Sequence, residues 1–226
     1  MQSACSTTTP IIVTDVSANT SSSTDTGLPA LLLASTSPRR RELLSQAGLT
    51  FQVVSPGPSG GVDESPLAGE AVAHYVARVA RDKALAGQTE AQRLGLPAWP
   101  VLGADTTVTL DGRILGKPAD AAEATAMLES LSGRTHQVLT ALCLVGRHGE
   151  RAVTSVSEVR FRALSAVEVA AYVGSGEPYD KAGGYGIQGR GALLIEHLSG
   201  SYSGVMGLPL HELGELLRAL APLETP

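Results

Sequence analysis

A short serine- and arginine-rich segment could bind an anion. Residues 35–41 read Ser-Thr-Ser-Pro-Arg-Arg-Arg and follow an apolar run at 30–34 that predicts a buried strand. Ser37 and Pro38 are residue types that favour the N-cap and the first position of a helix. A helix N-terminus has free N–H groups and a partial positive charge, and arginine can grip phosphate through two hydrogen bonds. The segment therefore predicts a phosphate site, with an ordinary capped helix and a solvated basic face as the alternative.

Two acidic segments could supply carboxylates for catalysis. Asp105 ends the apolar segment that begins at Pro100, in a place where open α/β sheets hold their ligands. It could be a general base, a metal ligand or only a turn residue at the end of a strand. Asp63 and Glu64 follow a Pro- and Gly-rich loop at 56–61. They are solvated surface charges unless they lie near Asp105, in which case the converging carboxylates could hold Mg²⁺.

Two lysines and a glycine-rich segment complete the candidate residues. Lys83 falls in a stretch with helical periodicity at 67–86, and Lys117 falls in a Gly-Lys-Pro loop that lacks the pattern of a P-loop. Either lysine could be an ordinary surface charge. The glycines within 179–189 allow the backbone to approach a ligand closely. Gln188 has an amide that donates and accepts hydrogen bonds, which suits a base edge, unless the segment is only a surface loop.

The elements that must position these residues follow an α/β order. Strands are expected at 30–34, 100–103, 136–145 and 151–163, with a further strand-like run at 192–195. Helices are expected at about 38–48, 67–86, 120–131 and 165–173, and one more after Pro209. Asp111-Gly112 is a typical hairpin turn. Alternation of this kind is typical of the α/β class.

Composition and charge limit the class of protein. The chain has 226 residues, 43% of them hydrophobic, and 17 Lys and Arg against 22 Asp and Glu give a net charge of −5. These values indicate a soluble globular protein, and no apolar run is long enough to cross a membrane. The acidic balance argues against binding to nucleic acid or to an anionic membrane. Cys5 and Cys143 are too few for a disulfide framework or a structural zinc site.

The first 28 residues differ from the rest. Residues 1–28 are rich in Ser and Thr and contain no Lys or Arg, and the apolar stretch 11–13 is too short for a secretion signal. We expect a disordered N-terminal extension there, or residues that precede the true start of the protein. Residues 29–226 are expected to form one domain. Without a secretion signal, the expected location is the cytoplasm.

Taken together, the segments resemble the Maf family of nucleotide pyrophosphatases. The matching segments come in family order: STSPRR (35–40), VDE (62–64), ARDKA (80–84), GADT (103–106), GKP (116–118), LSG–TH (131–136), DKAGGYGIQG (180–189) and GLPL (207–210). They span nearly all of the chain beyond the first 28 residues. The resemblance implies an α/β fold with a mixed central sheet flanked by helices, in two lobes around a deep nucleotide-binding cleft, often as a homodimer.

The resemblance also implies an activity. Members of the family hydrolyse nucleoside triphosphates to the monophosphate and pyrophosphate with a divalent metal, Mg²⁺ or Mn²⁺. The pattern gives Asp105 the role of proton acceptor. The branch that acts on dTTP and UTP is similar at three specificity positions, which are Arg39, Thr106 and Gln188 here. The sister branch that acts on 7-methyl-GTP typically has an aromatic residue, Gln and Glu instead.

The implied mechanism assigns a role to each remaining candidate. The metal would bridge Glu64 and Asp105. The triphosphate would be held by Ser35, Ser37, Arg39, Arg40, Lys83 and Lys117. One alternative is a non-catalytic, nucleotide-binding regulator of septum formation, which would not need Asp105. The other is a nucleic-acid binder that uses residues 39–41, which the net charge opposes.

Overall fold

The computed structural model describes residues 28–55, 61–147 and 149–220, so residues 1–27 of the expected extension lie outside the described part. The strands are β1 (Leu31–Leu33), β2 (Phe51–Val53), β3 (Val101–Leu110), β4 (Arg113–Leu115), β5 (Thr135–Gly146), β6 (Gly149–Phe161) and β7 (Ile195–Ser199). The α-helices are α1 (Pro38–Gln46), α2 (Val72–Arg93), α3 (Ala121–Leu131), α4 (Ala166–Val173), α5 (Tyr202–Val205) and α6 (Leu210–Leu220). Short 3₁₀ helices follow α4: η1 (Glu177–Asp180), η2 (Ala182–Gly184) and η3 (Gly189–Leu194).

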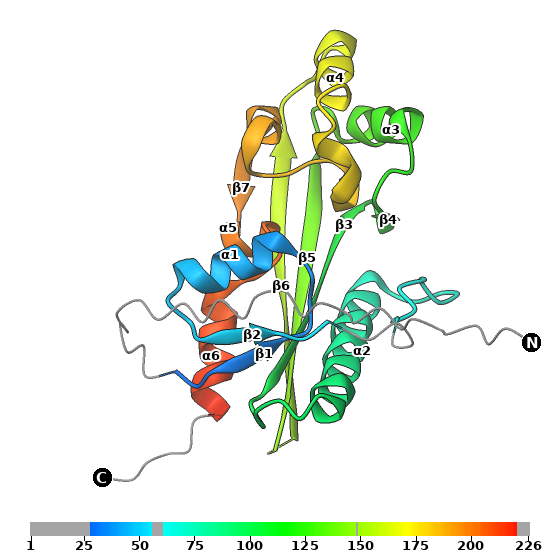
Figure 1. Cartoon of the computed structure of the whole chain (residues 1–226). Helices are drawn as coiled ribbons and strands as arrows, with labels where there is room; N and C mark the ends of the chain where they lie inside the picture. The colour runs from blue at the N-terminus through cyan, green and yellow to red at the C-terminus, as the bar shows by residue number, and fades with distance from the viewer. Residues whose placement is uncertain (1–27, 56–60, 148, 221–226) are drawn as a thin grey trace, which may run out of the picture.

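These strands form one mixed sheet (Figure 1). The order is β2-β1-β3-β5-β6-β7, and β4 pairs with β3. Strand β1 is parallel to β2 and β3, whereas β5, β6 and β7 continue the sheet in antiparallel pairs. Figure 1 shows the long strands running through the molecule, with α3 and α4 toward one end and α1 and α2 toward the other. The expected mixed sheet flanked by helices is confirmed, and the two lobes stay a prediction.

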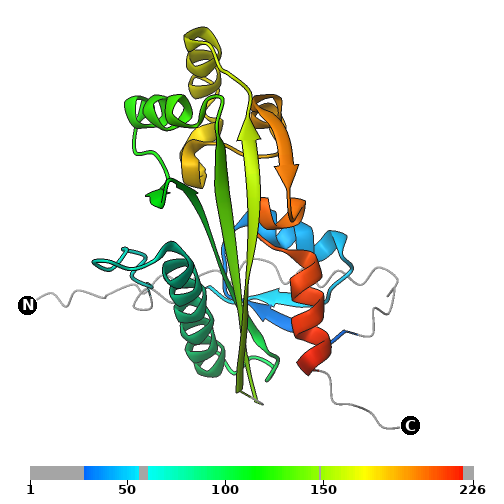
Figure 2. The same ribbon diagram turned by 180° about the vertical axis from the view of Figure 1, so that it is seen from behind.

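Helix α2 and helices α1 and α6 cover opposite faces of the sheet. The buried residues of α2 recur at helical spacing, at Tyr75, Val76, Val79, Ala80 and Ala84. This apolar face packs on odd-numbered residues of β5, whereas the even-numbered Leu142 and Leu144 belong to the core under α1 and α6. Figure 2 shows α6 lying along the sheet, away from α2. A strand that is buried on both faces is expected to alternate in this way.

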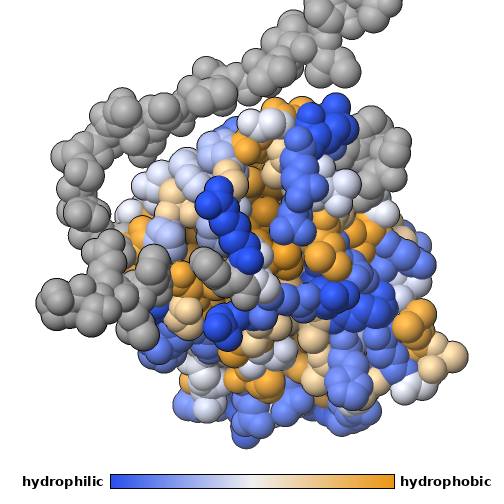
Figure 3. Space-filling model, turned by 90° about the horizontal axis from the view of Figure 1, so that it is seen from below, coloured by the Kyte–Doolittle hydropathy of each residue, from blue (hydrophilic) through white to orange (hydrophobic). Residues whose placement is uncertain are grey.

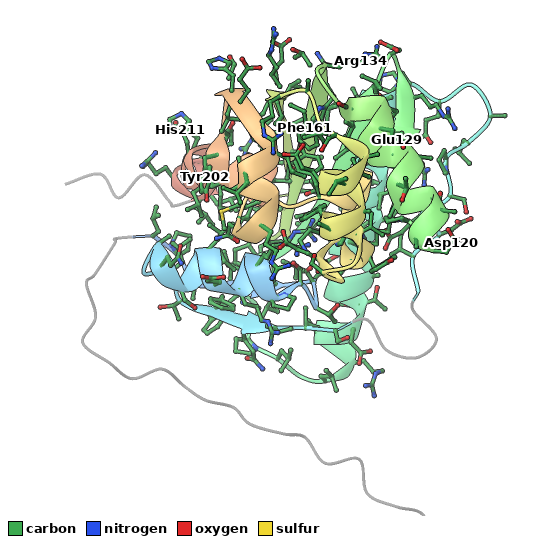
Figure 4. The ribbon with its side chains drawn as sticks, turned by 90° about the horizontal axis from the view of Figure 1, so that it is seen from above. Asp120, Glu129, Arg134, Phe161, Tyr202 and His211 are labelled. Carbon is green, nitrogen blue, oxygen red and sulfur yellow. The ribbon has the colours of Figure 1, made fainter. Side chains whose placement is uncertain are left out.

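The other end of the long strands has its own core. Phe161 is fully buried there, in a cluster that also contains Leu128 of α3 and Val169 of α4. Figure 4 shows Phe161 among the helices at this end, and Asp120 at the start of α3. The carboxylate of Asp120 accepts a hydrogen bond from the backbone N–H of Glu123, so the predicted helix start is confirmed. This cap fixes where α3 begins.

Two elements have different bounds from those expected. Helix α2 was predicted at 67–86 but starts later, because Leu67 and Glu70 form a turn closed by two hydrogen bonds between them. It also ends later, since Gly87 and Ala91 continue the buried face. Strand β3 is much longer than the predicted strand that begins at residue 100, because β5 pairs with it along most of its length.

Short elements were the hardest to predict. Strand β2 has three residues and was not expected, because a run this short has no readable pattern. The strand-like run at 192–195 is instead the junction between η3 and β7. The hairpin at Asp111-Gly112 is confirmed, with φ values of +52° and +76° that suit a type I′ turn between β3 and β4.

The surface carries mixed side chains. Figure 3 shows hydrophilic residues interspersed with apolar ones across the face seen from below. In the described residues, no helix combines the length and apolar character that crossing a membrane requires.

The contact between α2 and β3 depends on Gly103. A Cβ at this position would lie 2.1 Å from the carbonyl oxygen of Ala80 and 2.5 Å from the backbone nitrogen of Ala84. We expect Gly103→Ala to lower the free energy of unfolding by about 1–3 kcal/mol, measured by urea denaturation, because the helix backbone must move. Gly146→Ala is the control, since the nearest atom to its Cβ among the described residues would belong to Pro100, at an ordinary 3.5 Å. Equal stability of the two variants would contradict this packing.

Candidate active site

The candidate site lies at a break in the pairing of β3. On one edge of this strand, β1 pairs with residues 101–102 and β4 pairs with residues 108–110. Between them, residues 103–107 have no strand partner on that edge within the described chain. Asp105 and Thr106 are in this break and, as neighbours in a strand, point to opposite faces of the sheet. The break therefore allows both side chains to reach one space.

A pocket of about 720 Å³ opens at this break. It is lined by every residue that the sequence predicts for catalysis, specificity, phosphate binding or metal binding: Ser35, Ser37, Arg39, Arg40, Glu64, Lys83, Asp105, Thr106, Lys117 and Gln188. The tertiary structure thus brings all of these residues to one place, and their individual roles stay predictions. Lys117 and Gln188 are exposed at the pocket, whereas Arg40 and Asp105 are buried in it.

Lys83 links the two carboxylates that were predicted as metal ligands. Its Nζ lies 2.8 Å from Oδ1 of Asp105 and 3.0 Å from Oε1 of Glu64. Asp105 is 6% exposed, whereas the Glu64 side chain is about half exposed. Helix α2 carries Lys83, and the close contact of that helix with Gly103 sets the distance between Lys83 and Asp105. The two carboxylates therefore converge on a single cationic group.

Helix α2 also holds the segment that carries Glu64. Tyr75 Oη donates a hydrogen bond to the carbonyl oxygen of Glu64 at 2.9 Å. Arg78 donates to the carbonyl oxygens of Asp63 and Ser65, on either side of Glu64. These contacts anchor the backbone and leave the Glu64 side chain facing the pocket.

Glu70 fixes Arg78 in turn. Arg78 Nε and Nη2 donate to the two carboxylate oxygens of Glu70, at 2.7 Å and 2.9 Å. The hydrogen bonds from Arg78 and from the backbone of Leu67 lower the pKa of Glu70 to about 2. This two-point contact is the geometry in which arginine binds a carboxylate most specifically.

Arg40 joins three separate segments beneath the pocket. Its Nε donates to the carbonyl oxygen of Gly207, its Nη1 to Oγ of Ser35 and its Nη2 to Oγ1 of Thr106. Thr106 is tied further into the sheet, since its Oγ1 lies 3.0 Å from Oγ1 of Thr140. Burial lowers the pKa of Arg40, and the negative charge of nearby Asp105 partly opposes this effect.

The segment before α1 lines the pocket. Helix α1 begins at Pro38 as predicted, with Ser37 in the N-cap position, but the Ser37 side chain makes no capping hydrogen bond. The backbone N–H of Ser37 instead donates to Oγ of Ser35 at 3.2 Å. The first turn of α1 therefore remains suited to an anionic ligand.

Arg39 connects this helix to the glycine-rich segment across the pocket. Its Nη1 lies 2.9 Å from Oδ2 of Asp180, and Lys181 Nζ lies 2.6 Å from Oδ1 of the same residue. Arg39, Asp180 and Lys181 all line the pocket. The start of α1 and the segment that carries Gln188 are therefore in contact through charged groups.

A family model described as "Maf-like protein" matches residues 30–220 of the chain. The chain belongs to the Maf family. Two similar proteins, from Bordetella avium and Aromatoleum aromaticum, are named "dTTP/UTP pyrophosphatase". They are 56% and 54% identical over 190 and 194 residues, which is 84% of this chain and 94% of each relative. The structure of the Staphylococcus aureus Ham1 protein has a TM-score of 0.39 and 15% identity over 74% of this chain and 80% of that one, too low to support an argument.

The Maf pocket has a donor set that suits a divalent cation with phosphate bound. Carboxylate oxygens are the ligands that Mg²⁺ prefers, and it takes the rest from water and phosphate. Glu64 and Asp105 already converge on the ammonium group of Lys83, so a positive charge fits between them. In the described residues, no group of three or more His, Cys, Asp or Glu side chains could hold a metal. The protein could therefore supply only part of the ligand set.

Sequence reasoning missed several residues that shape the Maf site. Tyr75 and Arg78 hold the Glu64 segment, and Gly207 and Thr140 complete the contacts of Arg40 and Thr106. Tyr75 and Arg78 lie on the same helix as Lys83, so helical spacing was a usable signal for them. The contacts of Gly207 and Thr140 carry no local signal, because strand pairing and a distant loop create them.

A buried histidine lies beside the Maf pocket. Nε2 of His136 lies 2.6 Å from Oη of Tyr185, which lines the pocket, and His136 is only 2% exposed. Burial lowers the pKa of His136 to about 4. In an unfolded chain the same side chain would have a pKa of about 6.5.

We expect the free energy of unfolding to fall as the pH is lowered from about 6.5 to about 4. In this range the unfolded chain binds a proton at His136 that the folded protein does not bind, so acid favours unfolding. The full effect is on the order of 3 kcal/mol. Urea denaturation between pH 4 and pH 7 measures it. His136→Gln should reduce the dependence of the free energy of unfolding on pH, whereas His197→Gln, at an exposed position, should leave it unchanged. An unchanged pH dependence in His136→Gln would show that His136 is not its cause.

Proposed function

We propose that this Maf protein hydrolyses dTTP and UTP to the nucleoside monophosphate and pyrophosphate. The observation that carries the proposal is the convergence of Glu64, Lys83 and Asp105 in the pocket that also receives the anion-binding turn. Carboxylates beside a phosphate site suit hydrolysis of a phosphoanhydride. The names of the two relatives support dTTP and UTP as substrates.

The triphosphate lies against the start of α1 in this proposal. Ser35, Ser37 and the N–H groups of the first helical turn donate hydrogen bonds to phosphate oxygens. Arg40 has five N–H donors, and three of its nitrogen atoms already hold protein groups. Its remaining N–H groups can donate to phosphate, while Arg39 and exposed Lys117 contribute charge at the rim of the pocket.

Asp105 is the proton acceptor in this proposal. A water molecule attacks the α-phosphorus, its oxygen forms the new P–O bond, and Asp105 takes the proton. The bond between the α-phosphorus and the bridging oxygen breaks, and that oxygen leaves as part of pyrophosphate. Lys83 lines the same pocket, so its positive charge can act on the phosphate oxygens, where negative charge develops during the reaction.

Glu64 and Asp105 are the proposed protein ligands of Mg²⁺ or Mn²⁺. The cation would neutralise phosphate charge and help to align the substrate when bound. Tyr75 and Arg78 hold the Glu64 backbone in place for this role. Asp105 is held by its contact with Lys83.

Gln188, Arg39 and Thr106 are the proposed specificity residues. Uracil and thymine share a carbonyl acceptor and an adjacent N–H donor, and one amide side chain can pair with both groups. Gln188 is exposed at the pocket and can present such an amide. Thymine differs from uracil by a methyl group, worth only about 1–3 kcal/mol of discrimination, so both nucleotides are accepted.

Release of pyrophosphate from a panel of nucleotides with Mg²⁺ tests the proposal. We expect pyrophosphate and the monophosphate from UTP and dTTP, and much less from ATP and 7-methyl-GTP. Reaction in ¹⁸O-labelled water should place the label in the monophosphate, since water attacks the α-phosphorus. Orthophosphate as the product, or label in the pyrophosphate, would overturn the mechanism.

The alternative of a non-catalytic regulator is not favoured, because a pocket that only bound nucleotide would not need Asp105 and Glu64 beside the phosphates. A homodimer and a cytoplasmic location stay predictions from the sequence.

A further inference from the structure

The side chain of Gln188 has little packing of its own to fix it. It is exposed, and so are the two residues that follow it. A side chain that reads a base edge must nevertheless be held in place, because a mobile amide discriminates poorly. The contacts that hold this segment are therefore decisive for specificity.

Glu177 binds the backbone just after Gln188. Its Oε2 accepts a hydrogen bond from the N–H of Arg190 at 3.0 Å, and its Oε1 accepts one from the N–H of Gly191 at 3.1 Å. Hydrogen bonds to an ionised carboxylate are stronger than those between neutral groups. The Glu177 side chain therefore fixes the backbone of Arg190 and Gly191, just after Gln188.

Tyr172 binds the backbone just before Gln188. Its Oη donates to Oε1 of Glu177 at 2.9 Å and lies 3.3 Å from the N–H of Gly186, from which it accepts. Tyr172 is 4% exposed and comes from helix α4, so it is a rigid support. Tyr172 and Glu177 together hold the chain on both sides of Gln188.

The segment is folded tightly over these two side chains. A Cβ at Gly191 would lie 2.2 Å from the carbonyl oxygen of Gly186, so the two ends of the segment touch. Gly189 has φ of +67°, and a Cβ there would lie 3.0 Å from Oε2 of Glu177. These glycines explain how the loop can close around the carboxylate.

The same turn holds the partner of Arg39. Lys181 Nζ donates to the carbonyl oxygen of Glu177 at 2.7 Å and to Asp180, which pairs with Arg39. Helix η1 therefore supports two of the three proposed specificity positions. Neither Glu177 nor Tyr172 is among the residues that line the pocket.

We infer that Glu177, with Tyr172, is a positioning residue that sets nucleobase selection through Gln188. The inference rests on the proposed function, because it assumes that Gln188 reads the base. Glu177→Gln replaces one carboxylate oxygen by an NH₂ group, which cannot accept a hydrogen bond from a backbone N–H. Tyr172→Phe removes the hydroxyl that joins Glu177 to Gly186.

The readout is the ratio of kcat/KM for UTP to kcat/KM for ATP. We expect Glu177→Gln to lower this ratio by about ten- to a hundredfold, as loss of charge-assisted hydrogen bonds permits, with most of the change in KM for UTP. Tyr172→Phe should lower it by a smaller factor. Gln188→Ala should lower it at least as much as Glu177→Gln.

A double-mutant cycle separates positioning from general damage. If Glu177 acts through Gln188, the double variant Glu177→Gln/Gln188→Ala should have the same ratio as Gln188→Ala alone. Additive losses would overturn the inference. Should Glu177→Gln not fold, the cycle with Tyr172→Phe decides in the same way.

Glu168→Gln is the matched control. Glu168 also lies on α4 and accepts a hydrogen bond from the backbone N–H of Ser165, so Glu168→Gln weakens a helix cap. Its ion pair with Arg162 leads to the carbonyl oxygen of Leu193, and not to the backbone groups that Glu177 and Tyr172 bind. We expect a lower melting temperature and an unchanged ratio. An equal fall of the ratio in this variant would mean that stability, not positioning, sets selectivity.

The outcomes distinguish this inference from the function on which it rests. No pyrophosphate release by the wild type from any nucleotide would sink the proposed function and the inference together. A selective wild type whose ratio falls in Gln188→Ala, but not in Glu177→Gln or Tyr172→Phe, would sink the inference alone.

Discussion

Asp105→Asn is expected to lower the rate of pyrophosphate release from UTP by about 10²–10⁴-fold, the usual range for loss of an acid–base group. Asparagine has nearly the same shape but cannot take a proton from water at neutral pH. It also loses the charge that pairs with Lys83 at 2.8 Å. The fall should be in kcat, because the phosphate contacts proposed at the start of α1 do not involve Asp105, so KM should change little.

Asp111→Asn provides the control for this variant. Asp111 follows the same strand but is exposed in the hairpin turn, where it pairs with Arg134 and does not line the main pocket. Asparagine tolerates its positive φ. Activity should be unchanged in Asp111→Asn, and full activity in Asp105→Asn would contradict the assignment of the proton acceptor.

Lys83→Met is expected to lower the rate by about 10²–10³-fold, the loss typical of removing one group that stabilises developing charge. Methionine keeps the approximate length of the side chain but has no charge. Glu64 and buried Asp105 then face each other without the cation that now separates them. We therefore also expect a lower melting temperature, because a buried carboxylate loses its partner.

A second readout of Lys83→Met does not depend on catalysis. If Glu64 and Asp105 bind a divalent cation, Mg²⁺ alone should raise the melting temperature of this variant more than that of the wild type. Arg81→Met is the control, since Arg81 lies on the same helix but pairs with Glu150 at the surface. Equal effects of Mg²⁺ on both variants would argue against the metal site.

The sequence carried more information on local chemistry than on element boundaries. The starts of α1 and α3 could be predicted because Pro38 suits the first position of a helix and the Asp120 side chain caps α3, and both effects act over a few residues. The start of α2 could not be predicted, because Leu67 and Glu70 form a hydrogen-bonded turn where periodicity alone predicts helix. Strand β2 could not be predicted either, because its pairing with β1, and not a pattern of apolar residues, makes it a strand.

At the candidate site, too, some features could be predicted from the sequence and others could not. The motifs and their order were enough to predict which segments form the pocket, because together they resemble the Maf family, whereas each motif alone left alternatives open. The supports of those residues were not predicted: Arg40 reaches the carbonyl of Gly207 and Arg39 reaches Asp180, 167 and 141 positions away. Glu177 was not predicted either, since its role appears only when Arg190 and Gly191 fold back on it.

The sequence by itself determined the family and the α/β class, because motifs, caps and periodicity depend on near neighbours, and the resemblance to the family predicted the set of residues at the site. Only the tertiary structure decided that Lys83 lies between Glu64 and Asp105. It also decided that residues 103–107 of β3 have no strand partner on one edge among the residues that the structure describes. Both depend on the order of strands in the sheet and on the close contact of α2 with Gly103. Such contacts join residues distant along the chain, and no local pattern encodes their distances.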